Sequence, residues 1–525
     1  MTTASELGPH HPALVAAQRP DDLALILAGD GVGDGPAATM TWAEVAAASA
    51  QLARALARAG LRSGDGVAVV SSNRLEMIVT AWAALRSGLY CTPISTWLTA
   101  DEAAYIVADC DARALVASAD LASLASELTA RRPLDPCISV GGPLDGFTEW
   151  GELLAPESGE LLDHEVEGSM MLYSSGTTGR PKGVRRPLSG RPAGTANPLA
   201  PFAARAGLSA DTVYLSSAPL YHAAPIGWSL GTMRHGGTVV VLPHFDAELV
   251  LWAIERYRVT LAQFVPTMLQ RLVRLPPDLR DRCDRSSLRR VVHAAAPCPQ
   301  HVKHAAIEWL GPIVDEYYSG TEGSGITYIT STEWLEHPGS VGRPILGDLH
   351  ITDEQGRVVP PGTEGVIWFG NGEAYEYHGD EAATMARRHQ QGWTTLDDVG
   401  FVDDDGYLYL TDRRAHMIVS GGVNISPREI EDVLLQHPSV DDVAVIGVPH
   451  ADLGEEVKAV VCLVPGADAA LTTAELDAHC RARLARYKVP RSFDVVDALP
   501  RLPTGKLATR LLRDRYWAGS ESKLV

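Results

Sequence analysis

Short apolar runs rich in β-branched residues alternate with helical patterns along most of this chain. That alternation strongly limits the folds that the chain can adopt. Four of these runs are predicted to be buried strands: residues 66–70, 212–216, 238–242 and 260–265. Apolar residues spaced three and four positions apart predict helices over residues 40–59 and 247–257. Such alternation over several hundred residues indicates the α/β class, with sheets that are largely parallel.

The chain is predicted to form more than one domain, because its 525 residues exceed the roughly 250–300 at which a single core stops growing. After about Gly347, short strands alternate with turns, including a tight hairpin turned by Asp405-Gly406. Beyond Arg413, a helix is expected to begin with Ser426 as its N-cap and Pro427 in its first turn. We therefore expect an N-terminal domain over residues 1–412, made of stacked, mostly parallel α/β subdomains with a β-rich subdomain over about 347–412. A small α+β C-terminal domain would follow over 413–525.

The formal net charge of −20 at pH 7 narrows the classes of partner. An acidic chain repels nucleic-acid phosphates and anionic membrane surfaces, so we expect no nucleic-acid partner. The most apolar stretch, residues 77–90, is interrupted by Arg86 well short of the ~20 residues that a membrane-spanning helix needs. We therefore expect no stable membrane insertion.

The cysteines and the N-terminus favour a cytoplasmic location. The seven cysteines are dispersed and form no Cys-x-x-Cys pair, which argues against a disulfide framework and against a zinc cluster. The first residues show no basic-then-apolar signal pattern. The oligomeric state is not readable from the sequence, which leaves a homodimer open.

The segment YSSGTTGRPKG, residues 173–183, has the clearest chemistry. Gly176, Gly179 and Gly183 free the backbone to curl, so that hydroxyls, N–H groups and Lys182 can surround phosphate oxygens. It is not a Walker A loop, because no Ser or Thr follows Lys182 and the glycine spacing differs. A short GTTG could be an ordinary surface turn, but the full segment favours phosphate binding.

This segment closely resembles the phosphate loop of the adenylate-forming superfamily, which includes acyl- and aryl-CoA synthetases, luciferases and the adenylation domains of peptide synthetases. The resemblance covers nearly the whole chain in the expected order. Beyond the loop it is carried by LYHAAP, GGTVVVLPHFDAELVLWAIERYRVT, YYSGTEG, GWTTLDDVGFVDDDGYLYLTDR, SGGVNISPREIE and PTGKLATR.

The resemblance implies a site for ATP. Phosphate would be bound by the loop residues Ser174, Ser175, Gly176, Thr177, Thr178, Gly179 and Lys182. Tyr318 would lie against the adenine ring, flanked by the turn that contains Ala295 and Ala296. Asp398 would accept hydrogen bonds from both ribose hydroxyls, with help from Arg413.

The resemblance also implies catalytic roles. Thr321 would contact phosphate, Glu322 would hold Mg²⁺, and Lys506 would reach the substrate carboxylate and the α-phosphate during adenylation. These residue types suit the reaction, because attack on phosphorus builds negative charge that lysine and a metal ion stabilise. Lysine is rare here, yet two of the six fall at the two positions, 182 and 506, where the family uses one. That favours an intact active site.

Ordinary structural roles remain open for several of these residues. Asp398 lies close to other aspartates that could all be solvated turn residues, and Glu322 could be a surface carboxylate or an N-cap. His222 could be a half-buried structural histidine. Ser420-Gly421-Gly422 could be a plain glycine turn.

The resemblance further implies an acid pocket and a second half-reaction. The pocket would be lined by His222, Gly227, Val265, His293 and Ala294, and its small residues suggest room for a bulky or polycyclic acid. His222 would also border the approach of the thiol. The C-terminal domain would be mobile, swinging at a hinge near Ala415 to present Ser420, Gly421 and Gly422 to the pantetheine arm of CoA.

The chain departs from the family pattern at several places, including Ser319-Gly320, the run after His293 and the hinge position Ala415, and two departures matter most near the site. Arg185-Arg186-Pro187 stands where the family often has Thr-His shortly after the phosphate loop, and LDDVG replaces the usual Thr-Gly-Asp. Neither change removes an expected phosphate, metal or ribose ligand.

Taken together, the residues and the resemblance predict an acyl-CoA synthetase that depends on ATP and Mg²⁺ and uses coenzyme A. It would convert a hydrophobic carboxylic acid to an acyl-adenylate and then to a thioester. No aspartate between Leu220 and Arg234 is placed to pair with an amino group, which favours a plain acid, and the nineteen residues after Lys506 leave no room for a carrier domain. The alternatives are an acyl-AMP ligase that loads a separate carrier protein and, as a different class, a nucleotide-binding pseudoenzyme.

Overall fold

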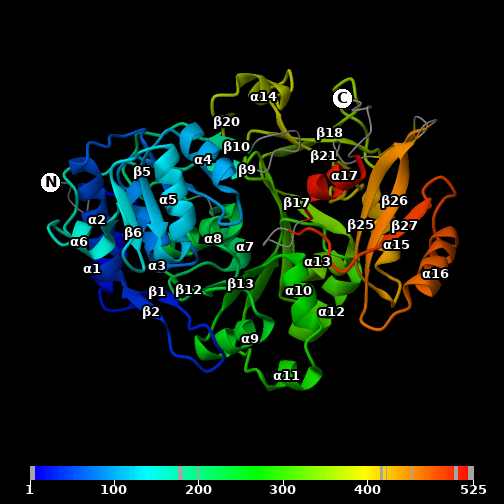
Figure 1. The fold of residues 1–525 in the computed structure, drawn as a ribbon, viewed down its shortest axis with the longest axis horizontal. Helices are drawn as coiled ribbons and strands as arrows, with labels where there is room; N and C mark the ends of the chain where they lie inside the picture. The colour runs from blue at the N-terminus through cyan, green and yellow to red at the C-terminus, as the bar shows by residue number, and fades with distance from the viewer. Residues whose placement is uncertain are drawn as a thin grey trace.

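The computed structural model describes residues 6–174, 181–197, 200–413, 418–420, 423–450, 453–501 and 507–517. It has a large N-terminal part built on two extended sheets and a smaller C-terminal part with a sheet of its own (Figure 1). This arrangement confirms the predicted mixed α/β class with a small second domain.

The largest sheet changes from parallel to antiparallel along its length. Its thirteen strands among the described residues are β1 (Leu23–Leu27), β2 (Ala38–Thr41), β11 (Val213–Ser216), β12 (Thr238–Val241), β13 (Leu261–Phe264), β14 (Arg290–His293), β15 (Val314–Tyr318), β16 (Ile326–Ile329), β17 (Ser340–Leu346), β18 (Asp348–Thr352), β19 (Gly365–Gly370), β21 (Thr394–Val402) and β22 (Leu408–Arg413). The order is β18-β19-β21-β22-β17-β16-β15-β14-β13-β11-β12-β1-β2. Pairing is parallel from β1 through β12, β11, β13 and β14 to β15, and antiparallel beyond β15.

The second sheet is parallel throughout, in the order β7-β6-β5-β3-β4-β8. Its strands are β3 (Gly66–Val70), β4 (Tyr90–Pro93), β5 (Ala112–Ser118), β6 (Cys137–Val140), β7 (Thr148–Glu149) and β8 (Ser169–Met170). Each of the four strands predicted from apolar runs is present, as β3, β11, β12 and β13, with bounds within one residue of the prediction.

The helix predicted over residues 40–59 begins two residues late, because Ala38–Thr41 forms β2. The helix itself is α2 (Trp42–Arg58). Its start is fixed by a capping box, in which the Thr41 hydroxyl accepts from the Glu44 N–H at 3.2 Å and the Glu44 carboxylate accepts from the Thr41 N–H at 2.7 Å. The helix predicted over 247–257 is α9 (Ala247–Arg256).

The core of the N-terminal part lies between the two sheets. Helices α3 (Leu75–Leu85) and α8 (Ala223–Arg234) pack against each other there; α3 contacts strands of both sheets, and α8 contacts β11 and β12 of the largest sheet. Every residue of α3 except Glu76 is buried, so the most apolar stretch of the chain is a core helix. None of the described helices has both the length and the hydropathy that crossing a membrane requires.

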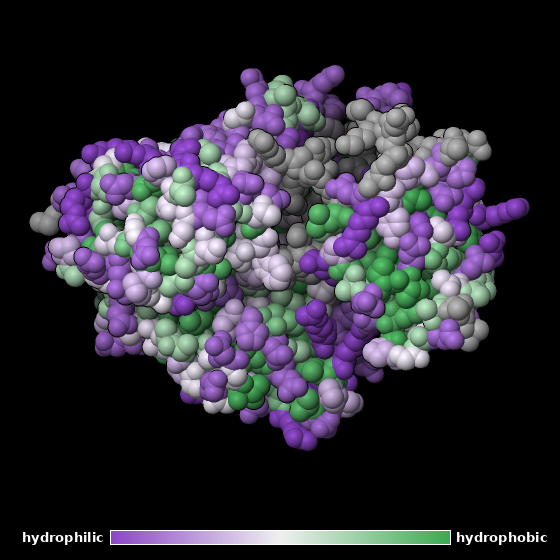
Figure 2. Space-filling model, viewed as in Figure 1, coloured by the Kyte–Doolittle hydropathy of each residue, from purple (hydrophilic) through white to green (hydrophobic). Residues whose placement is uncertain are grey.

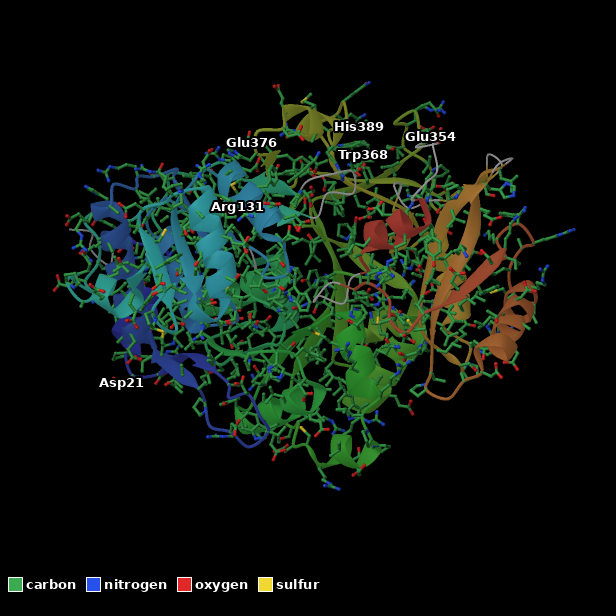
Figure 3. All side chains as sticks on the ribbon, in the orientation of Figure 1. Asp21, Arg131, Glu354, Trp368, Glu376 and His389 are labelled. Carbon is green, nitrogen blue, oxygen red and sulfur yellow. The ribbon has the colours of Figure 1, made fainter. Side chains whose placement is uncertain are left out.

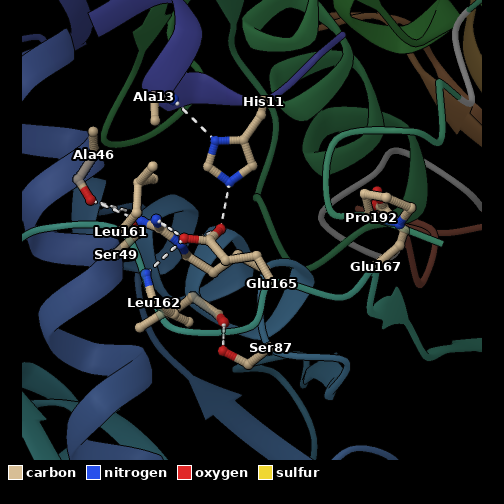
Figure 4. Close-up of polar contacts among 12 residues, drawn as sticks. His11, Ala13, Ala46, Ser49, Ser87, Leu161, Leu162, Glu165, Glu167 and Pro192 are labelled. Carbon is tan, nitrogen blue, oxygen red and sulfur yellow. Dashed lines mark hydrogen bonds and ion pairs between the residues drawn. The ribbon is translucent and has the colours of Figure 1, made fainter. Parts of the chain in front are cut away.

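A buried ion network ties the N-terminal helix α1 (Pro12–Gln18) to this core (Figure 4). Nδ1 of His11 accepts from the Ala13 N–H at 3.1 Å, so Nε2 carries the proton and lies 2.8 Å from Oε2 of Glu165. Arg86 donates to the same carboxylate and to the Ser49 hydroxyl. Burial alone would raise the pKa of Glu165, but the hydrogen bonds from His11 and Arg86 outweigh it and hold that pKa at about 2.

The β-rich part predicted after about Gly347 is continuous with the largest sheet, since β17 pairs with β16 on one side and with β22 on the other. The predicted hairpin is present: β21 and β22 are antiparallel, with Val402 opposite Leu408. Gly406 in its turn has φ of 81°, in the left-handed region that favours glycine.

The remaining N-terminal helices cover the sheets and connect their strands. They are α4 (Ala100–Asp109), α5 (Ala122–Arg131), α6 (Trp150–Leu154), α7 (Ala200–Ala206), α10 (Pro266–Val273), α11 (Pro277–Arg282), α12 (Gln300–Leu310), α13 (Ser331–Glu336) and α14 (Glu381–Ala386). On the face shown in Figure 2, hydrophilic side chains dominate and hydrophobic ones form smaller patches.

The C-terminal part has hydrophobic clusters of its own. Its strands and helices are β23 (Ile418–Ser420), β24 (Val423–Ile425), β25 (Val440–His450), β26 (Gly454–Leu463), β27 (Ser492–Val495), α15 (Pro427–Leu434), α16 (Ala469–Arg481) and α17 (Thr509–Trp517). Ser426 precedes α15 as predicted, but its hydroxyl does not cap the helix. It donates at 2.9 Å to the carbonyl of Thr411 in the N-terminal part, and Arg428 donates to the carbonyl of Leu410.

Candidate active site

A small antiparallel sheet holds the two ends of the phosphate-loop segment side by side. It consists of β20 (Glu376–Tyr377), β10 (Lys182–Arg185) and β9 (Leu172–Ser174). Lys182 pairs with Ser174 and Gly183 with Tyr173. A Cβ at Gly183 would lie 2.9 Å from the Tyr173 hydroxyl, so glycine is needed for this close approach. Ser175, Gly176, Thr177, Thr178 and Gly179 lie outside the described residues.

Lys182 has an acidic partner in the structure. Its Nζ lies 3.2 Å from Oδ2 of Asp380 and 5.4 Å from the centroid of the Tyr377 ring. Asp380 also caps α14 by accepting from the Ala383 N–H at 2.8 Å. That backbone hydrogen bond, followed by Lys182, lowers the pKa of Asp380.

Thr321 and Glu322 lie in the turn after β15. Glu322 is 7% exposed, which excludes a simple surface carboxylate, and its Oε1 accepts a hydrogen bond from the Tyr377 hydroxyl at 2.7 Å. Arg186 donates to the backbone carbonyls of Thr321 and Glu322 at 3.2 and 3.1 Å. The departure from the family pattern at Arg186 therefore supplies a side chain that fixes this turn.

Tyr318 and Asp398 meet although they are eighty positions apart in the sequence. The Tyr318 hydroxyl donates to Oδ2 of Asp398 at 2.6 Å, and both side chains are buried. The neighbouring Asp397 instead pairs with Arg387, with Nη2 and Oδ2 2.9 Å apart. Asp398 is thus the aspartate of LDDVG that contacts Tyr318. Arg413 lies opposite it across the β21–β22 pairing.

The turn after β14 carries the residues expected near adenine and the reacting acid. His293 is fully buried, with Nε2 3.6 Å from Oε2 of Glu316, and Lys303 Nζ lies 2.6 Å from the same oxygen. Burial lowers the pKa of His293 to about 3, so the ring is neutral. Ala294 is buried, Ala295 is exposed with φ of 75°, and Ala296 is partly buried.

The predicted acid-pocket residues on α8 and α10 lie at or near the starts of these helices. His222 is half-buried and precedes α8, with its ring centroid 4.4 Å from that of Tyr221. Gly227 has open space where a side chain would point, since nothing lies within 4 Å of an added Cβ. Val265 is buried and precedes α10.

In the C-terminal part, Ser420 ends β23 and pairs with Val423 and Gly454. Gly421, Gly422, Ala415 and Lys506 lie outside the described residues. The described residues include no cluster of three or more His, Cys, Asp or Glu that could bind a metal ion by themselves. A single buried carboxylate, Glu322, suits Mg²⁺, which usually takes one or two carboxylates and completes its shell with phosphate oxygens and water.

Tyr377 and Asp380 contact the expected site residues although the sequence did not single them out. Tyr377 lies on β20, next to the exposed Glu376 labelled in Figure 3. The segment YEYHGD that contains both carries no phosphate or metal motif. The pairing of Val184 with Tyr377 and of Arg185 with Glu376 brings it to the site.

Comparison with known families and proteins points to one group. Residues 13–374 match the AMP-binding enzymes, and residues 429–506 match the C-terminal domain of AMP-binding enzymes. A feruloyl-CoA synthase from Amycolatopsis sp is 35% identical over 91% of this chain and 94% of its own. A 2-succinylbenzoate–CoA ligase from Bacillus subtilis is 30% identical over 91% of this chain and 93% of its own.

Solved structures give the same result. An o-succinylbenzoate CoA synthetase from Bacillus subtilis, in complex with its acyl-adenylate intermediate, superposes with a TM-score of 0.81 at 28% identity, over 96% of this chain and 97% of that chain. An amide bond synthetase from Marinactinospora thermotolerans also has a TM-score of 0.81 at 28% identity, over 97% of this chain and all of that chain.

Proposed function

The chain belongs to the AMP-binding enzymes of the adenylate-forming superfamily and is an acid–thiol ligase, and we propose that it joins a hydrophobic, bulky carboxylic acid to coenzyme A. The reaction would run in two steps. The acid carboxylate attacks the α-phosphorus of ATP and releases pyrophosphate, and the CoA thiol then attacks the acyl carbon and releases AMP.

The hydrogen bond between Tyr318 and Asp398 is the observation that carries this proposal. It joins the residue expected against adenine to the residue expected at the ribose, from two different strands. A buried, ionised carboxylate is a strong acceptor, and its two oxygens together offer about four lone-pair sites for hydrogen bonds such as those from ribose hydroxyls. Such a preformed pair suits a nucleoside better than it suits a purely structural contact.

In the first step, Lys182 would exchange its contact with Asp380 for phosphate oxygens, and Lys506 would approach the carboxylate and α-phosphate. Glu322 would hold Mg²⁺ at the phosphates, where the ion supplies charge neutralisation as pyrophosphate leaves. Thr321 would donate its hydroxyl to phosphate. Arg186 keeps this turn in place through the carbonyls of Thr321 and Glu322.

In the second step, the C-terminal domain would present Ser420, Gly421 and Gly422 to the pantetheine arm, and His222 would border the path of the thiol. Glycine there would let the backbone approach the arm closely. The hydrogen bonds of Ser426 and Arg428 to residues 411 and 410 join the two parts close to the expected hinge.

An acid that carries an aromatic ring is the first class to test. Feruloyl-CoA synthase and 2-succinylbenzoate–CoA ligase are named among the similar proteins, and an anthranilate CoA ligase superposes with a TM-score of 0.82 at 26% identity. Helix α8 has small residues at positions 223, 224 and 227, and the space at Gly227 is open. This open space is compatible with a bulky acid.

A second candidate is loading of a separate carrier protein. A fatty acid–[acyl-carrier-protein] ligase from Streptomyces coeruleorubidus is 29% identical over 93% of each chain. The first half-reaction would be the same, and only the acceptor would differ.

Pyrophosphate release with a panel of aryl, fatty and polycyclic acids, with and without CoA, tests the proposal when the products are identified by mass spectrometry. Formation of acyl-CoA from one class supports it. Adenylate that accumulates while CoA is ignored favours carrier loading. ATP binding without turnover of any acid would favour the pseudoenzyme.

A further inference from the structure

Tyr377 contacts two charged residues that are expected to act at the phosphates of ATP, Glu322 and Lys182. Its hydroxyl donates to Oε1 of Glu322 at 2.7 Å, and Nζ of Lys182 lies 5.4 Å from its ring centroid. The Tyr377 side chain is buried, with 3% exposure. One tyrosine therefore bridges the expected metal ligand and the expected phosphate-binding lysine.

The backbone around Tyr377 is fixed by several hydrogen bonds. Tyr377 pairs with Val184 of β10, and the next residue, His378, donates its N–H to the carbonyl of Gly183 at 2.8 Å. The Tyr377 N–H donates to the Thr384 hydroxyl of α14 at 2.9 Å. These contacts hold the ring in one place relative to Lys182.

The hydrogen bond also orients the Glu322 carboxylate. The Tyr377 phenol is the donor and Oε1 of the Glu322 carboxylate is the acceptor. With Oε1 held by Tyr377, Oε2 points toward Gly320, where an added Cβ would lie only 2.8 Å away. The same added Cβ would lie 2.5 Å from Cδ2 of Leu396, so glycine at position 320 lets Leu396 and the Glu322 carboxylate pack close together.

We propose that Tyr377 is a positioning residue that holds Glu322 in the orientation needed to bind a divalent cation at the nucleotide phosphates, and that keeps Lys182 close to these phosphates. The inference rests on the proposed function. It adds a residue from outside the phosphate loop and from outside the turn that contains Glu322. Residues that hydrogen-bond to a metal ligand, without binding the metal themselves, usually contribute about 10- to 100-fold to metal affinity.

Tyr377→Phe tests the proposal, because it removes one hydroxyl and keeps the ring beside Lys182. Binding is measured by calorimetry without any acid present, first with ATP and Mg²⁺ and then with AMP, which lacks the β- and γ-phosphates. We expect the variant to bind ATP with Mg²⁺ about 10- to 100-fold more weakly and AMP as tightly as the unaltered protein. The magnesium concentration needed for half-maximal ATP binding should rise in parallel.

Tyr375→Phe is the matched control. Tyr375 lies in the same buried cluster, with its ring edge-on to that of Tyr377 and the centroids 5.6 Å apart. Its loss of a hydroxyl should leave the magnesium dependence unchanged. Thermal unfolding of both variants checks that the fold is retained.

Three outcomes would overturn the role of Tyr377. The first is equal effects of the two tyrosine variants, and the second is equal weakening of ATP and AMP binding by Tyr377→Phe. The third is full additivity with Glu322→Gln, since two residues that act through one metal ion should not add. If the unaltered protein shows no magnesium-dependent binding of ATP, the proposed function itself fails, and Tyr377 has no such role.

Discussion

The hydroxyl of Tyr318 lies 2.6 Å from Oδ2 of Asp398, and this contact joins strand β15 to strand β21 at the buried edge of the site. Asp397 next to it has φ of 62° and forms an ion pair with Arg387. Two adjacent aspartates thus have different partners, and Asp398 is the one that contacts Tyr318.

Asp398→Asn should raise the KM for ATP by about 10- to 100-fold, because hydrogen bonds to a charged acceptor contribute roughly 1.5–3 kcal/mol. Pyrophosphate release at varied ATP concentration measures it. Asp397→Asn is the control and should change the KM for ATP little. Equal effects of the two variants would contradict the assignment of the ribose to Asp398.

Lys506→Ala should suppress adenylate formation by about 100-fold or more, because it removes a cation from the developing charge on phosphate. The same variant should still form thioester from a supplied acyl-adenylate. Lys488→Ala is a suitable control, since Lys488 lies in the same domain and pairs with Glu429 there at 2.5 Å. Unchanged pyrophosphate release by Lys506→Ala would show that Lys506 is not the adenylation lysine.

Ala295→Gly should stabilise the protein by about 0.5–1 kcal/mol. Ala295 has φ of 75°, a conformation that costs a residue with a Cβ roughly 1–2 kcal/mol, and the gain is reduced by the greater freedom of glycine in the unfolded chain. Chemical denaturation measures the difference. Ala296→Gly in the same turn should instead be destabilising. If both substitutions lower stability alike, the strain at residue 295 is not significant.

The buried His293 should make the protein less stable as the pH falls. Its folded pKa of about 3 is below the ordinary value of 6.5, so between these values the unfolded chain binds a proton that the folded protein does not. The free energy of unfolding should therefore decrease below about pH 6.5, by up to about 1.4 kcal/mol per pH unit from this residue.

Urea denaturation at pH 7, 6 and 5 tests this for His293→Asn against the unaltered protein. The variant should lose stability less steeply with falling pH, whatever its stability at pH 7. His244→Asn, at an exposed position, controls for the loss of a histidine as such. Parallel pH curves for the unaltered protein and His293→Asn would rule out the contribution of this residue.

The sequence predicted those site residues that lie within short contiguous motifs. Tyr318, Thr321 and Glu322 are recognisable in YYSGTEG, although the strand before them, β15, was not among the four predicted from apolar runs. Such local patterns can be read from the sequence because backbone geometry and burial impose a spacing on residues that are close in the chain.

Contacts between distant segments could not be predicted in the same way. Tyr377 reaches Glu322 across fifty-five positions, through a short strand with no distinctive composition. Arg186 was noted only as a departure from the family pattern, because its contact with the carbonyls of residues 321 and 322 depends on tertiary packing. The β-rich part was expected as a subdomain, but strand pairing between β17 and β22 makes it an extension of the largest sheet.

If Lys182 binds phosphate as proposed, its pairing with Asp380 would favour anions of higher charge. Because Asp380 already neutralises the ammonium group, a chloride or bicarbonate ion that replaced the carboxylate would leave the local charge balance unchanged. A triphosphate offers several negative charges to the loop and its N–H groups at once. The Asp380 carboxylate would therefore compete with anions for Lys182, so that a nucleotide would displace it and common cellular monoanions would not.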